Sequence, residues 1–176
     1  GDAYRFLARE HLLVAQLTDM LKVRPEQLPE RVNDMVEKLR VAEKEIQQVR
    51  VAQLLASAAS LAQSAQDVGG VSLVAHQAVG VNGGDARTLA LDVRGRMPAD
   101  VPAVVAIVGV SDNKPAIVVA LNDAARERGL SAGDLVRAAC AEVGGKGGGK
   151  PDLAQGGGTD ASGVDRALAA VVAGLG

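Results

Sequence analysis

Aromatic side chains are almost absent from this chain of 176 residues, in which Tyr4 and Phe6 are the only examples. Aromatic rings fill many protein cores and are the usual platforms on which nucleobases stack. Because 48% of the residues are nevertheless apolar, the core must be built from Ala, Val, Leu and Ile. Any contact with nucleic acid must therefore depend on shape and phosphate charge rather than on stacking against rings.

The chain also lacks a large excess of positive or negative charge, a second cysteine and long apolar runs. The 19 basic and 21 acidic residues create no general positive field, so any nucleic-acid binding must be local. Cys140 is the single cysteine; it excludes an internal disulfide and, within LVRAACAEV, is predicted to be a buried helix residue. No apolar run approaches the roughly 20 residues that span a bilayer, and no signal peptide opens the chain. We therefore expect a soluble, cytoplasmic protein without a membrane partner, and its start inside a helical pattern indicates a fragment.

Glycine divides the chain into two parts. Only Gly1 precedes Gly69, whereas the other 20 glycines lie at Gly69 or beyond it. This shift predicts a helical domain over residues 1–68 and a globular α+β domain over residues 69–176.

The first part has the periodicity of two helices. Apolar residues on one face predict a helix over 3–21, and Pro25 and Pro29 then suit a turn and the start of a long helix over about 28–66. Two such helices are expected to form an antiparallel hairpin or rod. The long helix carries a heptad seam that would pair either with residues 3–21 or with a second copy of the chain. The candidate self-association residues of this seam are Val32, Met35, Leu39, Ile46 and Val49.

The second part alternates strand and helix patterns, which predicts a mixed sheet covered by helices. Ser131 and Asp134 resemble a capping box, and Gly144 is a natural stop for the helix that they begin. The expected elements are a strand over 71–79, a helix over 85–97, a hairpin of strands over 103–110 and 116–122, a helix from 131, and a last helix over 164–175.

The stretch GGKGGGKPDLAQGGGTD, residues 144–160, contains eight of the 21 glycines. Bare backbone lets successive N–H groups converge on an oxyanion, and Lys146 and Lys150 would add positive charge. Pro151 stands where a P-loop needs Ser or Thr, so the stretch is not a P-loop. It is expected as a loop between two helices rather than after a strand, which excludes a dinucleotide-binding fingerprint. A flexible surface linker is the alternative interpretation.

GGGKPDLAQGGG closely resembles the glycine-rich motif of the DHH-associated domain that ends alanyl-tRNA synthetases and also occurs in DHH phosphoesterases. The resemblance covers nearly the whole chain and implies a C-terminal domain that binds the tRNA elbow and links aminoacylation with editing. It also implies the catalytic and editing domains as partners, and homodimers in some members. The tRNA- or phosphate-binding residues that it implies are Lys146, Gly147, Gly148, Gly149, Lys150, Gln155, Gly156, Gly157 and Gly158.

The same resemblance implies that this chain is not itself catalytic. Phosphoesterases of the family have a histidine where Lys150 stands, and no DHH metal motif is present. His11, His76 and Cys140 do not form the zinc cluster of an editing domain, so no metal or cofactor is expected here. ATP, magnesium and zinc are expected only in other domains of the synthetase.

Three alternatives remain open from the residues. Arg94 and Arg96 are candidates for additional RNA contacts on the polar side of their helix. The chain as a whole would otherwise be a dimerisation module of the same enzyme, or the substrate-binding half of a DHH-type phosphoesterase.

Overall fold

The computed structural model describes residues 1–176, which form two compact units, Gly1–Arg50 and Val51–Gly176. The boundary lies within one long helix, whereas the glycine distribution places it at residues 68 and 69. The difference arises because the end of that helix packs on the second unit, where Ala58 is fully buried. None of the helices is both long and apolar enough to cross a bilayer.

The first unit consists of α1 (Asp2–Leu21), the 3-10 turn η1 (Pro25–Gln27) and most of α2 (Leu28–Gln63). Helix α1 ends where Lys22 adopts a left-handed conformation, with φ of 51°. Pro25 occupies the first position of η1, where its missing N–H has no helical partner to lose. Both helices agree with the predicted ones.

The predicted side-by-side packing of these helices is absent. No residue of α1 is buried, and the neighbour of α1 in this unit is the turn η1. The chain leaves α1 through the left-handed Lys22 and an extended Arg24, so the turn does not fold α1 back along α2. Most apolar residues of α1, and of the part of α2 that lies in this unit, consequently stay exposed.

The second unit is built on a mixed sheet of six strands in the order β1-β2-β3-β4-β6-β5. Only β2 and β3 are parallel; every other neighbouring pair is antiparallel. Helix α3 (Gly83–Arg96) forms the crossover that the parallel pair requires. The strands are β1 (Gln66–Val68), β2 (Val71–Val79), β3 (Ala103–Ser111), β4 (Lys114–Leu121), β5 (Lys146–Gly149) and β6 (Leu153–Gly157).

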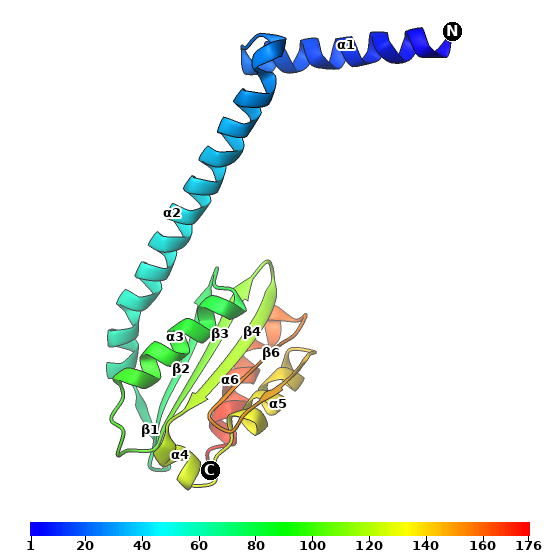
Figure 1. Ribbon diagram of the computed structural model, residues 1–176. Coiled ribbons are helices and arrows are strands. Elements are labelled where there is room, and N and C mark those ends of the chain that lie inside the picture. The colour runs from blue at the N-terminus through cyan, green and yellow to red at the C-terminus, as the bar shows by residue number, and fades with distance from the viewer. The chain divides into compact units, whose positions relative to one another are not determined.

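Helices cover both faces of this sheet (Figure 1). Helices α5 (Ala132–Glu142) and α6 (Val164–Ala173) lie on one face, and α3 lies on the other. The end of α2 packs on the same side as α3, through Leu54, Ala58 and Leu61. The central strands β3 and β4 are thus buried on both faces, which explains their continuous β-branched runs. Two short helical segments, α4 (Asp123–Glu127) and η2 (Ala161–Gly163), complete the unit.

The predicted α+β class, the β3–β4 hairpin and the buried position of Cys140 are confirmed. One predicted detail is wrong: Ser131 precedes α5 as expected, but its side chain makes no capping hydrogen bond. The side chains that do cap α-helices are those of Asn82 on α3 and Asn122 on α4.

Candidate functional site

The glycine motif is a β-hairpin, not the loop that its composition suggests. Strand β5 pairs with β6 in a register that places Gly147 opposite Gly156 and Gly148 opposite Gln155. The Lys150 N–H donates to the Leu153 carbonyl at 3.0 Å and closes the turn. The hairpin forms the end of the sheet, with β6 paired to β4 and β5 at the edge.

Close packing explains most of the motif glycines, against α5 at Gly147 and Gly156 and against neighbouring backbone at the others. A Cβ added to Gly156 would lie 2.6 Å from the Cys140 Sγ and 2.5 Å from the Gly147 Cα. A Cβ on Gly147 would lie 2.5 Å from the Val136 Cγ1. Added carbons at Gly145, Gly149, Gly157 and Gly158 would each meet backbone atoms within 3 Å. Gly147 and Gly156 therefore let α5 and the hairpin approach each other, and the remaining glycines let neighbouring backbone segments do so. The sequence pattern did not indicate this structural role.

Gly148 is the exception within the motif. A Cβ there would have no heavy atom within 4 Å, and its φ does not lie in the left-handed region. Since Gly147 faces α5 and strand residues alternate, Gly148 and Lys146 face the opposite side of the sheet. Gln155, the cross-strand partner of Gly148, faces that side as well.

On this side the hairpin borders a hollow of about 410 Å³. Its walls come from the hairpin and from Arg87 of α3, and both Arg87 and Lys150 are exposed. Arg87 was not predicted from the sequence, because nothing in a helical pattern tells which strand an exposed arginine lies beside. The lining residues are Arg87, Gly148, Gly149, Lys150, Asp152, Leu153, Ala154 and Gln155.

The two arginines predicted as additional RNA contacts lie elsewhere on α3. Arg94 donates to the Leu121 carbonyl at 3.3 Å and to the Asp152 carbonyl at 3.5 Å, so it ties α3 to β4 and to the hairpin turn. Arg96 pairs with Asp92 at 3.0 Å along its own helix. Neither lines the hollow, and Arg94 acts here as a structural link.

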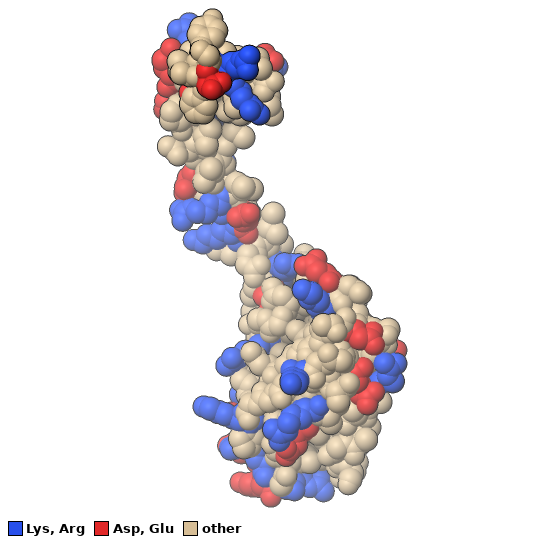
Figure 2. Space-filling model, turned by 90° about the vertical axis from the view of Figure 1, so that its right-hand side faces the viewer, with Lys and Arg blue, Asp and Glu red and all other residues tan.

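The lysines of the hairpin are exposed and form no ion pair. Some other basic side chains of the second unit are paired with acids, as Arg126 is with Asp123 and Arg137 with Asp134. Figure 2 accordingly shows lysines and arginines in separate groups with acidic residues among them, not one continuous basic surface. Positive charge available to an anion is therefore concentrated locally.

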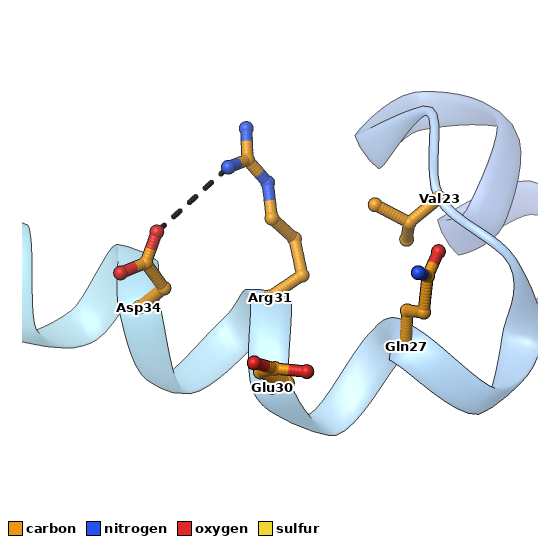
Figure 3. Close-up of a pocket in the computed structure, with 5 residues that line it drawn as sticks. All are labelled: Val23, Gln27, Glu30, Arg31 and Asp34. Atoms are coloured by element: carbon orange, nitrogen blue, oxygen red, sulfur yellow. Dashed lines mark ion pairs between the residues drawn. The ribbon is translucent and has the colours of Figure 1, made fainter.

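A second hollow, of about 400 Å³, lies in the first unit where η1 meets α2 (Figure 3). It is lined by Val23, Gln27, Glu30, Arg31 and Asp34, and Arg31 lies 3.9 Å from the Asp34 carboxylate. The hydrogen bond and charge of Lys38 hold the pKa of Asp34 below its usual range. Because two carboxylates accompany one arginine in its lining, this hollow is a poor receptor for phosphate.

The residues predicted for self-association remain accessible on α2. Ile46 and Leu39 are 66% and 60% exposed, and Val32, Met35 and Val49 are also exposed. No group of three or more His, Cys, Asp or Glu residues is placed to hold a metal ion.

The second unit is an α+β domain of a recognisable class. Its mixed six-stranded sheet lies between helices and ends in a glycine hairpin that packs against α5. The chain belongs to the DHHA1 domain family, which matches residues 70–175. Among solved structures, it is similar to the C-Ala domain of Aquifex aeolicus alanyl-tRNA synthetase, with a TM-score of 0.58 and 26% identity. That match covers 64% of this chain and 97% of the other.

Curated relatives cover the whole chain. An alanine–tRNA ligase of a Nocardioides species is 68% identical over 176 residues, and that of Streptomyces avermitilis is 54% identical over 171 residues. The matches cover 100% and 97% of this chain but 20% and 19% of those proteins. The chain thus spans about a fifth of the length of these relatives, and it is similar to the C-terminal part of alanine–tRNA ligases.

Proposed function

We propose that this chain is a non-catalytic, tRNA-binding C-terminal domain of an alanine–tRNA ligase, and that the β5–β6 hairpin is its RNA contact. The observation that carries the proposal is the pair of exposed, unpaired lysines, Lys146 and Lys150, at the two ends of the glycine strand. Similarity to alanine–tRNA ligases supports tRNA as the partner.

The spacing of the lysines suits a polyanionic strand. Three residues of extended chain separate Lys146 from Lys150, so over four residue steps their backbones lie about 13 Å apart at roughly 3.3 Å per residue. Two lysines whose backbones lie this far apart can reach different phosphates of one RNA backbone. Because bare glycines lie between them, no side chain on β5 blocks the approach.

Binding by so few cations is expected to be weak in isolation and steeply dependent on salt. The formal net charge of −2 adds no general attraction. Covalent connection to the aminoacylation and editing domains of the ligase would raise the effective concentration of tRNA at this domain. In that role the domain grips the tRNA elbow and helps present the acceptor end to both sites, while ATP, magnesium and zinc belong to the other domains.

A salt titration of tRNA binding tests this assignment. Removing one phosphate-binding lysine should reduce the magnitude of the log affinity–log salt slope by about one. The double variant Lys146→Ala/Lys150→Ala is therefore expected to bind alanine tRNA more weakly and with a slope smaller by about two. The charge-matched control Arg9→Ala/Lys44→Ala, on exposed faces of α1 and α2, should leave the slope unchanged. Equal slopes for both double variants would overturn the hairpin assignment.

The elbow is tested separately, with the same chain and two RNAs. Intact alanine tRNA should bind more tightly than a minihelix that carries only the acceptor stem. Equal affinity at the same salt concentration would show that the domain does not select the elbow.

Dimerisation through α2 is a second candidate function, favoured by the charges that flank its heptad seam. In a parallel pair of helices, Lys38 of one copy would face Glu43 of the other, and Glu45 would face Arg50. The exposed apolar seam between them would then be buried. Sedimentation of the chain at high micromolar concentration decides the matter, because a monomer there would exclude this dimer.

A further inference from the structure

Gly148 has no packing reason to be glycine. The other glycines of the hairpin strands would clash with α5 or with the neighbouring strand if they carried a Cβ, whereas Gly148 faces open space. Its backbone conformation is open to any residue, and glycine in a strand costs stability because it loses more conformational freedom on folding. The fold alone would accept a larger, more stabilising side chain at this position.

The position of Gly148 suggests what the missing side chain leaves free. Gly148 lies in the lining of the hollow of about 410 Å³, with Arg87 from α3 and with Lys150 and Gln155 from the hairpin. A hollow of this size falls within the range of small-ligand sites. Any side chain at 148 would project from the strand on the side of the sheet where Gln155 also projects.

We propose that this hollow receives one unstacked nucleobase of the bound RNA, which lies against the bare peptide surface of Gly148. The proposal deepens the RNA-binding function above and depends on it. In this proposal the RNA contact is not purely electrostatic, because one base also leaves its stack and is bound by the protein.

The lining supplies the chemistry that a nucleotide requires. A flat ring can rest on a strand surface from which no side chain projects, and the Arg87 guanidinium can lie against the ring, as arginine does in other RNA complexes. The Gln155 amide offers both a donor and an acceptor to the edge of the base. Lys150, which forms no ion pair, supplies a positive charge for the phosphate of the same nucleotide.

The test adds atoms to the floor of the hollow without disturbing the packing. Gly148→Val is expected to fold normally because nothing lies within 4 Å of its Cβ position, and valine suits a strand. If a base occupies the hollow, this variant should bind alanine tRNA roughly tenfold more weakly, which is the typical effect of removing one base from its protein platform. Gly148→Ala should fall between the parent and Gly148→Val. The matched control is Gly95→Val on exposed helix surface, where an added Cβ also meets nothing.

Affinity within twofold of the parent for a folded Gly148→Val would overturn the nucleobase proposal. The RNA-binding function would survive that result if Lys146→Ala/Lys150→Ala still weakened binding, so the two failures are distinguishable.

A second measurement separates a base from a phosphate alone. The Gly148 amide resonance should shift and saturate with the four nucleoside 5′-monophosphates, or with a subset of them, but not with ribose 5-phosphate at the same concentration. Identical shifts with ribose 5-phosphate, or no saturable shift with any nucleotide, would refute the base-binding hollow.

Discussion

The contact between α5 and the hairpin predicts that one added methyl group at Gly156 will destabilise the second unit, whereas the same methyl at Gly148 will not. In Gly156→Ala the new carbon would lie 2.5 Å from the Gly147 Cα and 2.7 Å from the Lys146 carbonyl oxygen. Both atoms belong to the backbone of the paired strand and cannot rotate away. In Gly148→Ala the new carbon meets nothing within 4 Å.

The expected magnitudes follow from two opposing effects. Replacing glycine by alanine restricts the unfolded chain and stabilises a compatible site by about 0.4–1 kcal/mol. Overpacking a filled site costs about 1–3 kcal/mol. Gly148→Ala should therefore be neutral or slightly stabilising. Gly156→Ala should lose about 1–2 kcal/mol, which lowers the urea midpoint by roughly 0.5–1 M for a typical dependence on urea.

Cys140 provides a built-in reporter for this experiment. It is the only thiol and is fully buried beside the hairpin, so a short pulse of thiol reagent at each urea concentration reports unfolding of the second unit. The midpoint for Gly156→Ala should lie well below that of the parent, and the midpoint for Gly148→Ala at or above it. Equal midpoints for the two variants would refute the packing explanation of the glycines.

Two further predictions concern titrating groups. Burial lowers the pKa of His76, so below the unfolded pKa of about 6.5 the unfolded chain binds more protons and stability should fall as the pH drops. In urea midpoints measured between about pH 7.5 and 5.5, His76→Gln should flatten this decline. An unchanged decline in His76→Gln would contradict the assignment. Burial also raises the pKa of the Cys140 thiol. Iodoacetamide at about pH 8 should therefore modify the folded chain at least roughly tenfold more slowly than the urea-unfolded chain. Similar rates would show that this face of α5 is open to solvent.

Periodicity predicted the regular elements closely. The alternating and β-branched run VSLVAHQAV gave the bounds of β2, and the turn composition between residues 110 and 116 gave the β3–β4 hairpin. These predictions depend on local patterns that burial enforces along each element. The parallel pairing of β2 with β3 was not predicted, because it depends on α3 crossing over the sheet.

Composition misled the interpretation of the glycine motif for a physical reason. Glycine disfavours strands by itself, so three consecutive glycines in β5 suggest a loop. The strand forms because β6 and α5 pack against it, and α5 leaves no room for side chains at Gly147 and Gly156. Such close approach is a tertiary property. Lys146 and Lys150, predicted from the sequence as phosphate-binding residues, are exposed, and that role stays a prediction. Arg87, which lines the hollow, comes from a distant part of the sequence.

The demand for glycine where β5 and β6 meet α5 has a consequence for recognising related proteins. A sequence search that relies on Gly147 and Gly156 detects proteins in which a helix packs closely on a hairpin, whatever ligand each protein binds. Differences in the bound ligand should instead be sought at Gly148, Lys150 and Arg87, because these positions can change without disturbing the packing of α5 on the hairpin.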